Sequence, residues 1–490
     1  MPLLSYLLNK ILLIPLLITT LSLVSCTEQT TDANPPNVII ILADDLGYAD
    51  LSSYGATAYE TPNLDQLAAE GARFTNFYVN QPVCTASRAA LLTGSYSNRI
   101  GLNGALGPRT QIGINQNETT LGELFQRNGY RTAHYGKWHL GNFPQFHPLQ
   151  HGFDDFYGIP YSNDMWPFHP ERPEAWPDLP LYDNETIVGY NTDQTRFTTD
   201  FTQRTIDFIE YSVTDDTPFF IYLAHPMPHV PLFVAEERQG ISGAGIFGDV
   251  IREIDWSVGE ILDTLETLNI AKDTILIFLS DNGPWLSYGN HAGSALPLRE
   301  GKHTVFEGGI RVPFIARWPA SIPQGLEVDT PAMTIDLFPT FKEILNDRET
   351  GLPIDGKSIF NLITGIDSAA VQEAYFFYFR SNELQAVRSE NWKLHFPHAY
   401  RTLEGQVPGL DGIPGRYNDD LATGLELFDL SNDIGEQRNV ADQHPEVVQR
   451  LTALADAKRQ ELGDSLTNAI GAANREPGRI ILNRSSSSVY

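Results

Sequence analysis

Residues 37–45 read NVIIILADD, an aliphatic run that follows Pro36 and closes with two aspartates. An apolar run without polar interruption is typical of a strand that is buried on both faces, as in a parallel sheet. Open α/β sheets bind their ligands at the carboxyl ends of such strands. The run therefore predicts a central strand whose end delivers Asp44 and Asp45 to a site.

Further apolar segments suggest that strands and helices alternate along the chain. Strands are expected at 130–135, 218–224 and 274–279, and helices at 62–74, 120–128, 198–211 and 249–268. This alternation predicts an α/β fold with a large mixed, mostly parallel sheet sandwiched by helices. Residues 142–195 are rich in Pro, Trp, Tyr and Asp without clear periodicity, so we expect an extended loop region that contacts substrate.

The pattern changes after about residue 370. Short strands are expected at 374–379, 386–396 and 425–430, followed by a helix over 445–462. These elements predict a small C-terminal antiparallel sheet with one helix. We therefore expect a catalytic domain over 37–370 and a C-terminal subdomain over 371–490, whose serine-rich tail is expected to be disordered.

The formal net charge of the 490-residue chain is -28. A nucleic-acid-binding protein usually has the opposite balance, so this class of function is excluded. An acidic surface keeps a protein soluble, but it also repels anions at long range. An anionic substrate would therefore need a local cluster of cations.

The first residues indicate export. Residues 1–25 contain Lys10 and an apolar run over 11–24, which is short for a membrane span and typical of a signal peptide. The run ends in Leu-Val-Ser-Cys26, which resembles a bacterial lipobox and predicts lipidation of Cys26; the alternative is an ordinary signal peptide with a coincidental cysteine. Residues 26–36 would form a polar tether. We expect an exported bacterial lipoprotein, periplasmic or on the cell surface, that reaches the membrane only through its lipid anchor.

Polar side chains follow two of the predicted strands. Asp44 and Asp45 follow the first, and Asp281 and Asn282 follow the strand over 274–279. Either pair alone is common in turns. Together they offer hard oxygen donors that suit Ca²⁺, or less well Mg²⁺. The sequence therefore predicts a metal site at the carboxyl edge of the sheet.

A second set of side chains is cationic or can become so. Its members are Arg88, Lys137, His139, His229 and Lys302. Lys137 and His139 are two positions apart, so in an extended segment they face the same way. A lone His or Lys is more often a surface residue, but the set together could hold a tetrahedral oxyanion and stabilise its leaving group.

The stretch 84–94 reads CTASRAALLTG and joins a cysteine, a serine and an arginine within five positions. By itself it could hold an inert buried cysteine. Together with the segments around Asp44, Lys137, His229, Asp281 and Lys302, however, it resembles the type I sulfatases, the group of arylsulfatase A and galactosamine-6-sulfatase. The resemblance also includes the late segment 427–439 and covers nearly the whole chain after residue 36.

The resemblance implies an alkaline phosphatase-like fold and a sulfatase mechanism. Cys84 would be oxidised by a formylglycine-generating maturation enzyme to an aldehyde (3-oxoalanine), whose hydrate faces Ca²⁺. Asp44, Asp45, Cys84, Asp281 and Asn282 would form the metal site. The resemblance also implies that Arg88 would hold the hydrate and that Lys137 and Lys302 would bind the sulfate oxygens. His139 would take the proton of the hydrate. His229, with Lys302, would protonate the leaving oxygen.

One residue departs from the usual family pattern. Ala86 stands where most members have proline, so we expect maturation to depend on the host. The expected substrate is a sulfated carbohydrate or an aryl sulfate. Two alternatives remain open from the sequence: a phosphonate or phosphate-ester hydrolase of the same superfamily, and an inactive surface lipoprotein that binds glycans.

Overall fold

The computed structural model of the protein describes residues 35–480. The predicted signal peptide, the lipobox with Cys26, most of the tether and the serine-rich tail lie outside the described residues. The described residues form one compact unit. Among the residues that the structure describes, no helix combines the length and the apolarity needed to cross a membrane.

The run that begins at Asn37 forms the middle of the central sheet, as predicted. Strand β1 (Asn37–Ala43) pairs in parallel with β8 (Phe219–Ala224) on one side and with β9 (Thr274–Ser280) on the other. Its side chains alternate between two cores. Val38, Ile40 and Leu42 pack into one, and Ile39, Ile41 and Ala43 into the other. Because both faces are buried, each large aliphatic side chain stabilises the fold by about 1.5–3 kcal/mol.

The sheet has eleven strands and is mixed, mostly parallel at its centre. On the side of β8 follow β4 (Arg131–Lys137) and β5 (Asp155–Ile159), both parallel, and then the antiparallel β6 (Pro180–Asp183) and β7 (Thr186–Tyr190). On the side of β9, the antiparallel β10 (Arg311–Arg317) leads to β2 (Ala72–Tyr78). The short strands β11 (Leu326–Val328) and β12 (Ala332–Met333) pair with β2.

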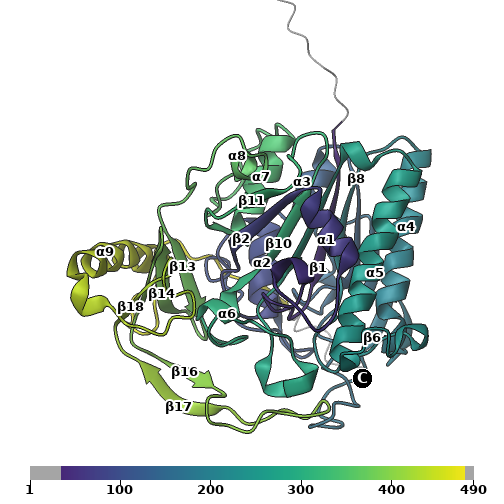
Figure 1. The fold of residues 1–490 in the computed structure, drawn as a ribbon. Coiled ribbons are helices and arrows are strands. Elements are labelled where there is room, and N and C mark those ends of the chain that lie inside the picture. The colour runs from purple at the N-terminus through teal and green to yellow at the C-terminus, as the bar shows by residue number, and fades with distance from the viewer. Residues whose placement is uncertain (1–34, 481–490) are drawn as a thin grey trace, which may run out of the picture. The chain divides into compact units, whose positions relative to one another are not determined.

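Helices cover both faces of this sheet (Figure 1). One face packs against α1 (Pro62–Ala69), α4 (Phe197–Thr214) and α5 (Gly245–Thr267), whose apolar residues join the core of Ile39 and Ile41. The other face packs against α2 (Cys84–Thr93), α3 (Leu121–Arg127), α7 (Leu337–Ile344) and α8 (Phe360–Ile363). The predicted sandwich of helices around a large mixed sheet is confirmed.

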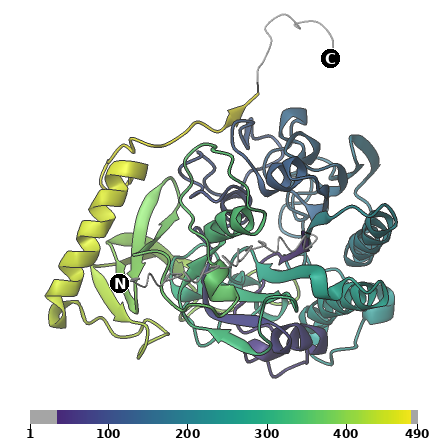
Figure 2. The same cartoon turned by 90° about the horizontal axis from the view of Figure 1, so that it is seen from above.

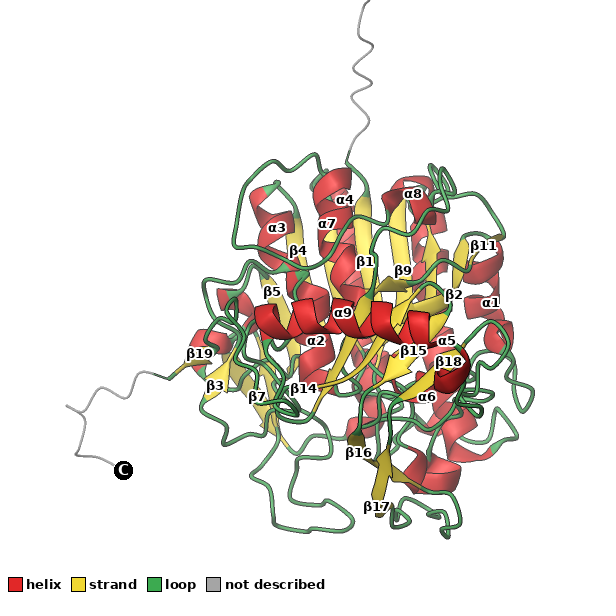
Figure 3. Cartoon of the chain, turned by 90° about the vertical axis from the view of Figure 1, so that its left-hand side faces the viewer, coloured by secondary structure: helices red, strands yellow, loops and turns green. Residues whose placement is uncertain are grey.

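The C-terminal region forms the small antiparallel sheet with one helix that the sequence predicts. Its strands are β13 (Tyr375–Phe379), β14 (Glu383–Ser389), β15 (Trp392–His395) and β18 (Glu426–Asp429). Helix α9 (Pro445–Leu462) packs against β14 and β15 and is seen along its length in Figure 3. In Figure 2 this sheet and α9 lie together to one side of the central sheet.

Three smaller elements complete the fold. A hairpin of β16 (His398–Thr402) and β17 (Asn418–Thr423) extends from the C-terminal region toward the lower edge of Figure 1, the edge toward which β1 runs. Strand β3 (Ile112–Gly113) pairs with β19 (Gly478–Arg479). The four-residue helix α6 (Glu307–Ile310) precedes β10.

Several local predictions are wrong. The helix expected over 62–74 ends at Ala69, and the chain continues into β2. The strand expected over 386–396 is the hairpin of β14 and β15, and the expected loop over 142–195 contains β5, β6 and β7. Lys137 and His139 do not share one extended segment, because β4 ends at Lys137 and His139 has a φ of +62°.

Candidate active site

The carboxyl ends of β1 and β9 bring the predicted metal-binding residues together. Ala43 lies beside Ser280 in the register of the two strands, so Asp44 and Asp45 emerge next to Asp281 and Asn282. The amide of Asp45 donates to Asp281 Oδ1 at 3.1 Å, and Asn282 Nδ2 donates to Asp45 Oδ1 at 2.7 Å. All four side chains are buried.

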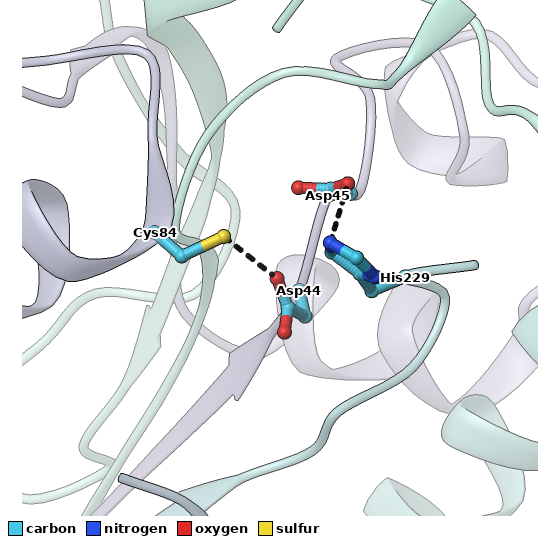
Figure 4. A group of neighbouring side chains, drawn as sticks. All are labelled: Asp44, Asp45, Cys84 and His229. Atoms are coloured by element: carbon cyan, nitrogen blue, oxygen red, sulfur yellow. Dashed lines mark hydrogen bonds and ion pairs between the residues drawn. The ribbon is translucent and has the colours of Figure 1, made fainter. Parts of the chain in front are cut away.

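Cys84 is the first residue of α2 and points toward these aspartates (Figure 4). Its thiol donates to Asp44 Oδ1 at 3.5 Å, and Lys302 Nζ donates to the sulfur at 3.4 Å. Only 2% of Cys84 is exposed. Burial, followed by the negative charge of Asp44, raises the pKa of the thiol, so the unmodified side chain stays protonated and is a weak nucleophile.

Three cations balance the three buried carboxylates. The guanidinium of Arg88 contacts Asp281 Oδ2 at 2.9 Å and Asp44 Oδ2 at 3.3 Å, and it also donates to the carbonyl of Lys137 at 2.8 Å. Lys137 Nζ donates to Asp44, and Lys302 Nζ donates to both oxygens of Asp45 at 2.7 and 2.8 Å. These charged side chains are almost fully buried, so the removal of any one would leave an uncompensated buried charge.

The pKa values of two carboxyls move in opposite directions. Burial alone would raise the pKa of Asp44, but the charges of Lys137 and Arg88 hold it well below its ordinary value. Burial, with the charge of Asp44 next, raises the pKa of Asp281 to about 7. Strongly shifted carboxyls in a cluster of this kind mark a functional site more often than a structural one.

Each of the two predicted catalytic histidines keeps one ring nitrogen engaged with the backbone. His139 Nε2 contacts the carbonyl of Leu106 at 2.8 Å, and its Nδ1 is buried without a hydrogen-bond partner in the structure. His229 Nδ1 contacts the carbonyl of Val230 at 2.6 Å, and its Nε2 lies 3.6 Å from Asp45 Oδ2. When the engaged nitrogen donates, the other nitrogen of each ring can accept a proton.

The residues present fit a hard divalent cation. Ligand atoms of Asp44, Asp45, Cys84 and His229 all lie within 4.8 Å of one another. Figure 4 shows these four side chains. Asn282 Oδ1 is buried and has no hydrogen-bond partner, as expected of an oxygen reserved for a metal. Asp281 is not part of that group, and its oxygens accept from Arg88 and from the amide of Asp45. His229 is part of it, although no metal role was predicted for His229.

Sequence reasoning missed two residues of this site. Ser162 accepts a hydrogen bond from Lys137 Nζ at 3.1 Å and belongs to the aromatic-rich region 142–195. Trp285 is half-buried, with Lys302 Nζ 4.7 Å from its ring centroid and the ring of His229 at 5.6 Å. Ser162 follows the carboxyl end of β5, and Trp285 follows that of β9. A position after the end of a strand is the one sequence feature that could have indicated a role in the site.

Buried cations and carboxylates around Cys84, at the carboxyl edge of a mixed sheet, form a site that could bind a charged ester and stabilise its hydrolysis. The chain belongs to the sulfatase family. The family described as Sulfatase matches residues 36–346, and the family described as C-terminal region of aryl-sulfatase matches residues 371–481. The resemblance drawn from the sequence is confirmed, and the protein is a sulfuric ester hydrolase.

Characterised relatives span nearly the whole chain. Arylsulfatase A of Bos taurus is 38% identical over 456 residues, which cover 88% of each protein. N-acetylgalactosamine-6-sulfatase of Canis lupus familiaris is 36% identical over 462 residues, 87% of this chain and 86% of that protein. A Bacteroides thetaiotaomicron sulfatase, solved in a study of the metabolism of multiple glycosaminoglycans, superposes with a TM-score of 0.72 at 29% identity, covering 87% of this chain and 99% of that one.

Proposed function

We propose that the protein removes sulfate from sulfated glycans, using an aldehyde made from Cys84 and a bound Ca²⁺. The observation that carries this proposal is the position of Cys84. Its sulfur lies at the start of α2, between Asp44 and Lys302, where the first amides of the helix favour an anion. The relatives named for N-acetylgalactosamine 6-sulfate and for glycosaminoglycan metabolism support a glycan as the substrate.

Asp44, Asp45, Asp281 and Asn282 would hold the metal, which when bound supplies positive charge to the sulfate oxygens and to residue 84. The hydrate of the aldehyde supplies two hydroxyls, one to accept the sulfo group and one to release it as sulfate. Arg88 is buried and fixed by Asp281 and by the carbonyl of Lys137, so it orients the side chain of residue 84 without moving.

The remaining residues bind sulfate and move protons. Lys137 and Lys302 are directed toward the sulfur of Cys84 and its neighbouring carboxylates, so they would bind the sulfate oxygens and stabilise charge as it develops. The unpartnered Nδ1 of His139 would take the proton of the hydrate. His229, beside Lys302 and Asp45, would protonate the leaving oxygen.

The proposal keeps three expectations from the sequence. Export as a bacterial lipoprotein through Cys26, with residues 26–36 as a tether, would place the enzyme where extracellular glycans are met. Ala86 is buried in α2, so the maturation enzyme that accepts it would have to act before this helix packs. We also propose the division into a catalytic domain over 37–370 and a C-terminal subdomain over 371–490.

Rates on 4-nitrophenyl sulfate and 4-nitrophenyl phosphate test the reaction class. The three cations are balanced by three carboxylates, so a bound Ca²⁺ would supply the excess positive charge for either anion, and the preference for sulfate rests on the sulfatase family to which the chain belongs. We expect kcat/KM of the matured enzyme to be at least about 100-fold higher for the sulfate. Equal or higher rates on the phosphate would favour the phosphate-ester hydrolase, and binding of a sulfated glycan without any turnover would favour the inactive lipoprotein.

Removal of the metal is expected to abolish turnover, and its return as Ca²⁺ is expected to restore it. Replacing Asn282 by alanine removes a buried ligand oxygen, so calorimetric titration of the chelator-treated protein should show Ca²⁺ binding at least about 10-fold weaker. Asn432→Ala, an exposed amide that bonds Asp429, is the matched control and should bind Ca²⁺ like the parent. Unchanged Ca²⁺ affinity in Asn282→Ala contradicts the assignment.

A further inference from the structure

A series of rings leads away from the reacting groups. The ring of His229 lies 5.6 Å from that of Trp285, and the ring of Trp285 lies 5.4 Å from that of His303. The backbone of His303 is anchored two residues before Cys84, because its amide donates to the carbonyl of Pro82 at 3.0 Å. His229 is buried, but Trp285 and His303 are flat and partly exposed. Such rings suit the apolar faces of sugars, so these two mark the direction in which a glycan would extend.

Arg401 stands at the end of this series, on strand β16 of the hairpin. Its Nη1 lies 3.5 Å from His303 Nδ1, and its guanidinium lies over the ring of Tyr417, 4.9 Å from the centroid. In Figure 1 the hairpin lies at the edge toward which β1 runs. The C-terminal region thus brings a cation to the surroundings of a site whose other cations come from the first 302 residues.

The charge of Arg401 is poorly neutralised. Its one carboxylate partner within 4 Å, among the described residues, is Asp419 at 3.5 Å, and the side chain of Asp419 is 65% exposed. The side chain of Arg401 itself is 32% exposed. Arg99, by contrast, holds the buried Asp355 with bonds of 2.7 and 2.6 Å, as a structural arginine does. A guanidinium that keeps donors free can bind a carboxylate or a sulfate with two parallel bonds.

Two further arginines lie on segments that contact His303 or Arg401. Arg380 follows Phe379, whose ring lies 5.9 Å from that of His303, and Arg416 precedes Tyr417 in the hairpin. Both are exposed, and neither makes an ion pair with a carboxylate of the described residues. In a chain with a net charge of -28, a polyanion is repelled at long range, so such a local cluster is what would capture it.

We propose that Arg401 is the centre of a second anionic subsite, which recognises a carboxylate or a further sulfate on the same glycan. The preferred substrate is then a multiply charged glycan. This inference rests on the proposed function, since it concerns the substrate of the same site. Arg401 does not touch the reacting atoms; it determines specificity by holding a neighbouring group of the substrate.

The test compares three disaccharides that carry the same scissile sulfate, linked to a neutral sugar, to a uronic acid or to a second sulfated sugar. Sulfate release by the matured full-length enzyme is measured for the parent, Arg401→Gln and Arg401→Lys. We expect the ratio of kcat/KM on a charged disaccharide to that on the neutral one to fall about 10- to 100-fold in Arg401→Gln, mainly through KM. Arg401→Lys should recover part of this ratio, and the two charged arms show whether carboxylate or sulfate is preferred.

Arg196→Gln is the matched control, because Arg196 is an exposed arginine whose ion pair with Asp200 lies within one turn at the start of α4. It should leave the ratio of the parent unchanged.

An equal loss on all three disaccharides, or no loss on any, overturns the subsite. If Arg401→Gln does not fold, the salt dependence of KM is measured for the parent enzyme instead. Its KM for the charged disaccharides must rise with salt concentration more steeply than its KM for the neutral one. A parent that cleaves aryl sulfates but no charged glycan overturns this inference alone, whereas a parent that cleaves no sulfate ester overturns the proposed function.

Discussion

Replacing Cys84 by alanine is expected to lower kcat for sulfate release by about 10⁵-fold or more, because the variant has no group that can become the nucleophile. The neighbouring Asp44 and Lys302 would remain, and so would Arg88. Binding of the substrate should therefore persist while turnover disappears. The measurement is sulfate release under saturating 4-nitrophenyl sulfate, with the midpoint of thermal unfolding as a control for the fold.

Cys84→Ser separates the proposed mechanism from simple loss of a side chain. A serine hydroxyl can accept the sulfo group and release the alcohol, but it has no second hydroxyl to expel sulfate. We expect the release of one equivalent of 4-nitrophenol at most, followed by arrest, with the sulfo group retained on the peptide that contains residue 84. Steady turnover by Cys84→Ser, or an unmodified thiol at Cys84 in active parent enzyme, contradicts the aldehyde mechanism.

The centre of the fold was predictable because its residues are apolar and are therefore excluded from water. The aliphatic run of β1 has no polar residue between Val38 and Ala43, so burial on both faces was the single favourable outcome. The aspartates that follow β1 and β9 then meet because parallel neighbouring strands end at one edge. The position of the predicted metal-binding residues follows from this local pattern, whereas the order of the strands does not.

Other elements depend on contacts that the sequence does not reveal. The residues after Ala69 keep a helical spacing of apolar side chains, but a Cβ at Gly71 would lie 2.2 Å from the carbonyl oxygen of Ala316. This close approach to β10 turns the chain into β2. Strand β10 itself contains Pro313, which argues against a central strand, and the structure accommodates it by a register shift between Val312 and Phe314.

The site was predictable to the same extent. Residues at strand ends, such as Asp44 and Asn282, were found from the sequence, and so were the charges that the family pattern names. Trp285, His303 and Arg401 were not, since their proposed roles come from contacts between segments, of which the contact between Arg401 and His303 spans 98 positions of the chain. Whether a cation such as Arg401 is neutralised by a carboxylate depends on the folded chain, so the neighbouring sequence does not predict it.

Replacing Lys393 by methionine is expected to destabilise the protein by about 3–5 kcal/mol, because it leaves two buried carboxylates without their shared cation. Lys393 Nζ lies 2.9 Å from Glu307 Oε1 and 2.9 Å from Glu436 Oε1, and all three side chains are 0% exposed. Methionine retains most of the volume of lysine, so the loss of free energy reports the charge rather than a cavity. The free energy of unfolding from urea denaturation is the measurement.

The cluster of Lys393, Glu307 and Glu436 also connects the C-terminal region to the segment that carries Lys302. Glu307 begins α6, five residues after Lys302, whereas Lys393 lies on β15 of the C-terminal sheet. Glu436 also accepts from the amide of Glu307 at 2.6 Å, so the C-terminal region holds the segment that carries Lys302. We therefore expect Lys393→Met to weaken the binding of 4-nitrophenyl sulfate as well as the fold, and Lys393→Arg to restore part of both.

The matched control is Arg450→Met, which breaks an exposed ion pair with Glu390 on the same C-terminal region (3.3 Å, with side chains 39% and 75% exposed). Its cost should stay within about 1 kcal/mol, because solvent screens the pair, and its KM should equal that of the parent. A loss in Lys393→Met no larger than that of the control would show that the buried cluster does not join the two regions. A large loss of stability with an unchanged KM would show that the cluster supports the fold but not the position of Lys302.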